Sequence, residues 1–246
     1  MSIVELVGFI SEWLGVAAVT HILSMLPQVR ERRPVDFHFR RREALISFSL
    51  FGVVLLAAVI FYFKQSVFHP EGLDPLVSSV WIQLILAVAC LAILAALMVI
   101  RRQPMLSIGW SRQMLRPAIQ ISLPLILLTI FLRGKIYSLL DGITQGEIVV
   151  LFAWLGIALA EETIFRGFIQ TRLSAYWGEQ RGWFFTALLF VIWKLPRLIA
   201  VVGLMPYGLL VVVAQALLVG WMMKKLGHVL APSIYRAISE WLILLI

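Results

Sequence analysis

Seven ionisable residues lie in or beside the apolar runs of the second half of the chain. They are Glu161, Glu162, Arg166, Lys194, Arg197, Arg236 and Glu240. A single such group at the centre of a bilayer costs on the order of 2.5–3.5 kcal/mol on insertion scales. We therefore expect the seven to face the interior of a helix bundle or an interface and to neutralise one another. Four-residue spacings place Glu162 with Arg166, and Arg236 with Glu240, on one helical face each.

A buried group of carboxylates and cations has two interpretations. In the catalytic one, a desolvated carboxylate acts as a general base, and the neighbouring donors stabilise an oxyanion. In the structural one, the ion pairs fix how the helices pack. The charges by themselves leave both interpretations open.

The elements that must position these charges are membrane helices. The chain of 246 residues is 61% hydrophobic and 14% charged, with a mean hydropathy of +0.96, whereas a soluble domain is about 45–50% apolar. A span needs roughly 20 apolar residues. The sequence predicts an all-α, polytopic membrane helix bundle of about eight helices, in the segments Ile3–Leu26, Ala44–Tyr62, Leu76–Ile100, Ala118–Leu132, Glu147–Phe168, Trp183–Trp193, Pro206–Met223 and Leu230–Ile246.

The two halves of the chain have different expected roles within one integral membrane unit. Residues 1–146 should form N-terminal transmembrane helices with basic cytoplasmic loops, and residues 147–246 a four-helix core. The fourth and sixth segments are short for a full span, so each should be tilted, broken or longer than drawn. The basic, Trp-containing stretch that starts at Leu106 is either an interfacial amphipathic segment or an ordinary basic loop.

Basic residues alternate between the loops. The loops after the odd-numbered segments hold fifteen of the 21 Lys and Arg residues, and the loops after the even-numbered ones hold five. This bias predicts that the first set faces the cytoplasm and that both termini lie outside. The short loops favour a prokaryotic inner membrane. The net charge of +8 reflects topology, so the lipid bilayer is an expected partner and nucleic acid is not.

Glu5 and Glu12 interrupt the N-terminal apolar stretch, which also lacks a basic start. Both features argue against a cleaved signal peptide. We expect a retained first helix.

Two motifs in the second half of the chain follow a family pattern. Glu161, Glu162 and Arg166 form the motif Glu-Glu-x-x-x-Arg. Phe190 and Lys194 lie where that pattern continues with Phe-x-x-x-His at the end of the next helix. This arrangement resembles the CAAX-protease and bacteriocin-processing family, also called the Abi family.

The last motif of that family is His-x-x-x-Asn, or His-x-x-x-Asp, in a helix that an Ala-Pro pair precedes. Ala231 and Pro232 match the pair, and Arg236 and Glu240 stand at the His and Asn positions. The similarity extends over roughly residues 147–246, and the eight-helix layout is also similar.

The resemblance implies a membrane-embedded endopeptidase that trims prenylated CAAX tails. In that family the motif glutamates, here Glu161 and Glu162, activate a water, and two histidines complete the site. Lys194 and Arg236 replace both histidines, and neither can bind zinc or shuttle a proton as imidazole does. Glu240 replaces the asparagine that helps to hold the oxyanion.

Two functions follow from the match and its departures. The first is a degenerate member that keeps the fold, has an ion-paired core and acts as a non-catalytic subunit or binding partner in a membrane complex, with other membrane proteins or a lipidated peptide as partners. The alternative is an active intramembrane endopeptidase that cleaves lipidated or membrane-bound peptides, with Arg236 stabilising the oxyanion. A transporter has less support, because no inverted repeat is evident.

We expect no cofactor, and zinc has little support. No HExxH motif is present, and the histidines are scattered over different segments, at His21, His38, His69 and His228. We expect His228 to lie at the membrane interface rather than to bind a metal. Cys90, the single cysteine, lies in an apolar run and is expected to be a packing residue.

Overall fold

The structure, a computed structural model, describes residues 3–30, 35–63, 75–202 and 206–245. Within these ranges it is all-α. The helices are α1 (Ile3–Leu23), α2 (Pro27–Arg30), α3 (Arg40–Phe63), α4 (Pro75–Ile100), η2 (Met105–Ile108), α5 (Arg112–Leu132), α6 (Ile136–Leu140), α7 (Gln145–Glu162), η3 (Thr163–Gln170), α8 (Thr171–Trp177), α9 (Glu179–Arg197), η4 (Leu198–Val202), α10 (Pro206–Leu226) and α11 (Leu230–Leu244). The expected fold class is confirmed.

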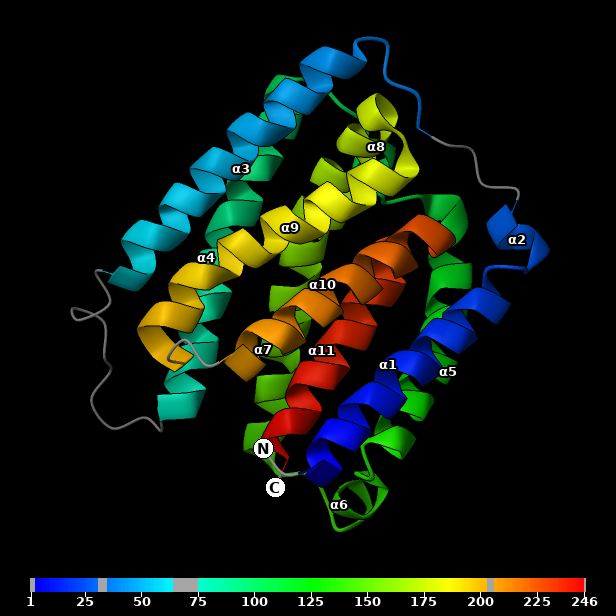
Figure 1. Cartoon of the computed structure of the whole chain (residues 1–246), viewed down its shortest axis with the longest axis vertical. Helices are drawn as coiled ribbons and strands as arrows, with labels where there is room; N and C mark the ends of the chain where they lie inside the picture. Colours follow the sequence, from blue (N-terminus) through cyan, green and yellow to red (C-terminus); the bar gives the residue numbers. More distant parts are fainter. Residues whose placement is uncertain (1–2, 31–34, 64–74, 203–205, 246) are drawn as a thin grey trace.

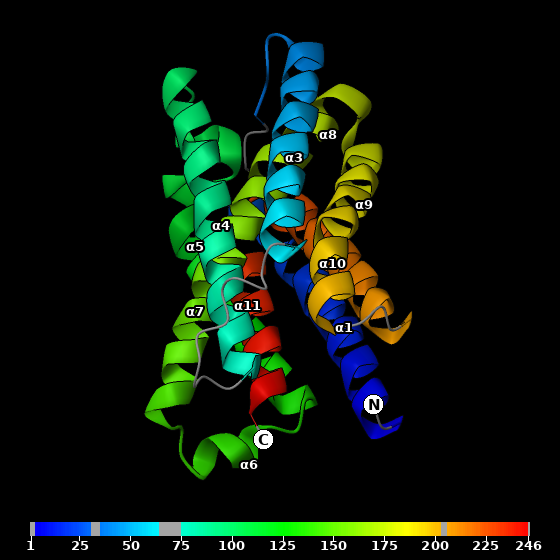
Figure 2. The same ribbon diagram turned by 90° about the vertical axis from the view of Figure 1, so that its left-hand side faces the viewer.

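The long helices form two rows that close into a ring (Figures 1 and 2). One row runs α4, α7, α11, α5, and the other runs α3, α9, α10, α1. Contacts of α3 with α4 and of α1 with α5 join the rows at their ends. The motif residues are on α7, η3, α9 and α11, so this arrangement places them between the two rows.

Each of the eight expected segments overlaps one of these long helices. Within the described ranges, six helical stretches are long and apolar enough to cross a membrane: Arg40–Phe63, Ser79–Ile100, Met105–Leu132, Gln145–Trp177, Glu179–Ala200 and Gly208–Leu226. The other two are shorter: Val7–Leu23 in α1, and α11 with 15 residues. Large apolar side chains on the outside of the bundle, such as Val99, Leu127 and Phe152, are about two-thirds or more exposed, as lipid contact requires.

The two segments that looked short are longer in the structure. α5 begins at Arg112, six residues before the apolar run, and α9 extends from Glu179 to Arg197. The basic stretch that starts at Leu106 is divided between the 3₁₀ helix η2, which packs against η3, and the first turns of α5, where Arg112 and Arg116 lie. The ends of α5 and α9 contain polar residues, so the apolar runs alone underestimated the lengths of these helices.

The chain continues from α7 through η3 into α8 without leaving a helical path. η3 is a π-helical segment of eight residues that follows directly on Glu162 and contains Arg166. π-helical turns occur frequently at functional sites because they redirect side chains. All eight residues of η3 are buried, so this segment lies at the centre of the bundle.

Gly167 allows η3 and η2 to approach closely. A Cβ atom there would overlap the backbone carbonyl of Ile108. We expect Gly167→Ala to lower the free energy of unfolding by about 1–3 kcal/mol, because backbone rather than a flexible side chain would have to move. Thermal unfolding in detergent checks this, with Gly52→Ala as the control, since a Cβ at Gly52 meets nothing within 4 Å. Equal melting temperatures for both variants would contradict it.

Candidate functional site

Glu161 and Glu162 are the last two residues of α7, and both are completely buried. α7 starts at a capping box in which the Thr144 hydroxyl accepts from the Glu147 N–H at 3.3 Å and the Glu147 carboxylate accepts from the Thr144 N–H at 2.7 Å. Packing against α4 and α11 then carries the helix into the bundle. Because successive helical residues point about 100° apart, the two side chains leave α7 in different directions and share only Arg236 as a partner.

Glu161 meets cations from two helices. Its Oε1 accepts from Lys194 Nζ of α9 at 2.8 Å and from Gln83 Nε2 of α4 at 3.1 Å. Its Oε2 accepts from Nη2 of Arg236 in α11. One carboxylate thus ties α7 to three other helices.

Glu162 is paired just as completely. Its Oε1 accepts from Arg236 Nη1 at 2.7 Å, and its Oε2 accepts from Arg166 Nε at 3.1 Å. Arg236 therefore bridges both glutamates with the two ends of its guanidinium fork, a geometry that lysine cannot provide. The group, which we call the glutamate cluster, consists of Glu161, Glu162, Arg166, Lys194 and Arg236 and has one more cation than carboxylates.

Phe190 of α9 lies in the middle of the cations. The ring centroid is 5.0 Å from the guanidinium carbon of Arg166, 4.9 Å from that of Arg236 and 5.5 Å from Lys194 Nζ. Cations this close to an aromatic face are attracted by its quadrupole. The Phe position of the second motif thus helps to hold the cations that stand at the two His positions.

The structure brings together most of the predicted site residues. Glu161, Glu162, Arg166, Phe190, Lys194 and Arg236 meet as one group, and the predicted pair Glu162–Arg166 is confirmed. Among the described residues, the ion pairs include neither Arg197 nor Glu240.

The expectation that all seven charges neutralise one another was therefore wrong in part. Arg236 points toward α7 and is 2% exposed, whereas Glu240, one turn later on α11, is only half-buried. Two fully buried carboxylates offer Arg236 a better pairing than a partly solvated one on its own helix.

A second buried network was not anticipated from the sequence. Glu12 of α1 is completely buried and pairs with Arg133 Nε, while Tyr235 of α11 donates its hydroxyl to Glu12 Oε1 at 2.9 Å. Arg133 also donates to Ser239 Oγ at 3.0 Å. The available signal was a glutamate inside an apolar run, which requires a partner. This network joins α1 to the C-terminal half of the ring.

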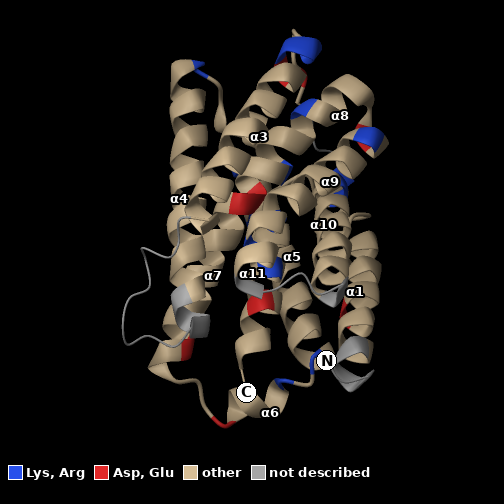
Figure 3. Ribbon diagram, turned by 60° about the vertical axis from the view of Figure 1, so that its left-hand side comes forward, with Lys and Arg blue, Asp and Glu red and all other residues tan. Residues whose placement is uncertain are grey.

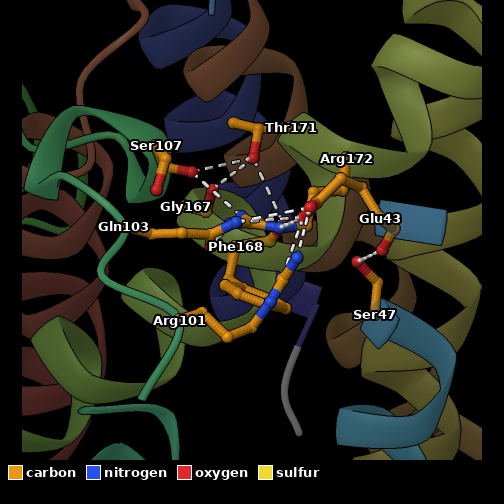
Figure 4. Close-up of polar contacts among 9 residues, drawn as sticks. All are labelled: Glu43, Ser47, Arg101, Gln103, Ser107, Gly167, Phe168, Thr171 and Arg172. Atoms are coloured by element: carbon orange, nitrogen blue, oxygen red, sulfur yellow. Dashed lines mark hydrogen bonds and ion pairs between the residues drawn. The ribbon is translucent and has the colours of Figure 1, made fainter. Parts of the chain in front are cut away.

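A third network lies at the end of the bundle that contains α8, and Figure 4 shows it. Glu43 of α3 accepts from Arg172 Nε at 2.9 Å and from Arg101 Nη1 at 3.1 Å. Arg172 also donates from Nη1 to the backbone carbonyls of Ser107 at 3.0 Å and Phe168 at 3.2 Å. The positive charge thus links α3, η2, η3 and α8.

Arg166 and Arg172 correct the count of loop cations. Both are among the fifteen cations counted in the loops after the odd-numbered segments, yet both are completely buried. Each has a carboxylate partner inside the bundle, Glu162 for Arg166 and Glu43 for Arg172. Most other Lys and Arg residues gather toward the end of the bundle that holds α8 (Figure 3).

His228 lies buried in the turn between α10 and α11. Its Nδ1 accepts from the Leu230 N–H at 3.1 Å, and its ring meets that of Trp110 edge-on with 5.5 Å between centroids. Burial lowers the pKa of His228 to about 4, so it is uncharged near neutral pH. Among the residues that the structure describes, which exclude His69, no group of three His, Cys, Asp or Glu side chains is placed to hold a metal.

One comparison with known proteins matches the part of the chain that carries the motifs. Residues 144–242 match a sequence model of the family described as type II CAAX prenyl endopeptidase Rce1-like. No curated protein and no solved structure shows a significant match to the chain. The resemblance inferred from the motifs is confirmed over this part of the chain, which contains every residue of the glutamate cluster.

Proposed function

We propose that this integral membrane protein, similar to CAAX endopeptidases over residues 144–242, is a non-catalytic relative that acts as a subunit or binding partner in a membrane complex. One observation carries the proposal: all four carboxylate oxygens of Glu161 and Glu162 accept hydrogen bonds from Lys or Arg. A carboxylate that activates water must take up its proton. Doing so here would break an ion pair inside the bundle, which is costly.

The residues at the two His positions do not supply the missing base. The guanidinium of Arg236 has no lone pair, and the ammonium of Lys194 has three donors and no acceptor. Arg236 is able to stabilise an oxyanion, which is the feature that an active endopeptidase would use. Without a group that takes a proton from water, that donor alone leaves peptide hydrolysis slow.

The partner that we propose is membrane-bound: another integral membrane protein or a lipidated peptide of the class that the family's enzymes cleave. Large apolar side chains on the outer surfaces of the helices offer contact area for such a partner. We place the protein in a prokaryotic inner membrane with both termini outside, because the basic loops would then face the cytoplasm.

Purification of the native protein in mild detergent, followed by mass spectrometry, tests this function. We expect other membrane proteins to be recovered with it in stoichiometric amounts. Recovery of the chain alone would contradict the role as a subunit and would favour the endopeptidase. In that case cleavage of a prenylated CAAX peptide, with Glu161→Ala as the inactive control, becomes the deciding assay.

The glutamate cluster also predicts the outcome of an attempt to restore the motifs. We expect the double variant Lys194→His with Arg236→His to show no robust cleavage of a prenylated CAAX peptide, because Glu240 still stands at the Asn position. Peptide products are measured by mass spectrometry, with the wild-type chain as the control. Efficient cleavage by the double variant would show that the two imidazoles are sufficient.

A further inference from the structure

A large cavity opens at the end of the bundle that holds α8. Its volume is about 1510 Å³, and its lining comes from α2, η2, η3, α8, the starts of α5 and α9, and the end of α10. Ligand sites in proteins typically measure about 300–1,000 Å³, so there is room for a lipid headgroup and part of a chain. Of the family motif residues, only Arg166 lies in the wall of this cavity.

The charge of this cavity is strongly biased. Among the residues that the structure describes, the wall has one carboxylate, Glu179, and five cations: Arg30, Arg112, Arg116, Arg166 and Lys224. Arg112 and Arg116, on the first turns of α5, are exposed. Apolar residues such as Met105, Leu106 and Met114 occupy other parts of the wall. The cavity thus presents both cations and apolar surface to a ligand.

Arg166 connects the cavity to the glutamate cluster. It is completely buried, with Nε on Glu162 and Nη2 donating to the Ala216 carbonyl at 2.9 Å. Its Nη1 is buried and has no hydrogen-bond partner among the described residues, and the same holds for Arg236 Nε. A buried, unpaired donor on a cation is costly, and the cluster already has one cation more than carboxylates.

We propose that this cavity binds the phosphate group of an anionic amphiphile. A phosphate offers several acceptor oxygens and more than one negative charge, which suits a group of arginines better than a single carboxylate does. The apolar walls hold the adjoining carbon chain. The bound phosphate balances the excess positive charge of the glutamate cluster, whose Arg166 lies in the cavity wall. This site stands independently of the proposed function, since neither a partner protein nor catalysis enters the argument.

Thermal unfolding of the purified chain in neutral detergent tests the site. We expect dioctanoyl phosphatidic acid to raise the melting temperature in a saturable manner, and dioctanoyl phosphatidylcholine to raise it much less. Inorganic phosphate distinguishes the source of the ligand. If it competes with phosphatidic acid at comparable concentrations, the site recognises the free phosphate group, and if only the lipid binds, it recognises a lipid headgroup.

Matched variants distinguish binding at the cavity from nonspecific attraction of the lipid to surface charge. Arg112→Gln with Arg116→Gln should weaken binding of phosphatidic acid roughly tenfold or more, because two charge-assisted contacts are lost. Arg41→Gln with Arg42→Gln removes the same charge from exposed positions on α3 outside the cavity and should leave binding unchanged. Equal losses in both variants, equal shifts with phosphatidylcholine, or no saturable shift in the wild type would overturn the proposal.

Discussion

Replacing Glu161 by alanine should lower the free energy of unfolding by about 3–5 kcal/mol, because it leaves a buried cation without its counter-charge. Lys194 loses its only ion pair among the described residues, and Arg236 keeps only Glu162. The shift is measured by equilibrium unfolding in mixed micelles of dodecyl maltoside and sodium dodecyl sulfate.

Two further variants make this result specific to the glutamate cluster. Glu240→Ala removes a carboxylate from α11 that takes part in none of the ion pairs of the described residues, so its stability should stay close to wild type. Glu161→Leu with Lys194→Leu removes both partners of one pair and should be more stable than Glu161→Ala, since no lysine is stranded. Wild-type stability of Glu161→Ala would show that the pairs do not hold the helices together.

Replacing Arg172 by alanine should destabilise the protein by a similar amount, about 3–5 kcal/mol. The change leaves the backbone carbonyls of Ser107 and Phe168 without this donor and removes a cation 3.5 Å from the Phe168 ring centroid. Arg172→Lys keeps the charge but loses the planar fork, so its free energy of unfolding should lie between those of the wild type and of Arg172→Ala. The same unfolding measurement applies.

Arg181→Ala is the matched control for this network, because Arg181 is exposed at the start of α9. It should change stability by about 0.5 kcal/mol or less. A double-mutant cycle of Arg172→Ala with Glu43→Ala should give a coupling energy of roughly 0.5–3 kcal/mol, as for residues in contact. Additive effects would mean that the Glu43–Arg172 pair contributes nothing of its own.

The glutamate cluster illustrates how far local pattern predicts a site. The pair Glu162–Arg166 follows from helical spacing alone, and the structure places it at 3.1 Å despite the π-helical segment. That Lys194 and Arg236 would meet the glutamates followed from the motif register and from the cost of isolated charges in an apolar segment. The sequence did not predict that Gln83 of α4 would donate to Glu161, because Gln83 is neutral and belongs to no motif.

The partners within each network depended on helix rotation. Arg236 had a carboxylate one turn away on its own helix, yet it pairs with two on α7 because packing of α11 against α7 turns it inward. Glu12 and Arg133 are 121 residues apart, and Glu43 and Arg172 are 129 apart. No local period relates such residues.

The sequence by itself determined the membrane environment, the positions of the helices and the family motif, because hydropathy and spacing are properties of single segments. Only the tertiary structure decided which cation neutralises which carboxylate, which loop arginines are buried, and that a basic cavity reaches Arg166. These features depend on the order of the helices in the ring and on the face that each presents. Packing between segments distant in the chain sets both.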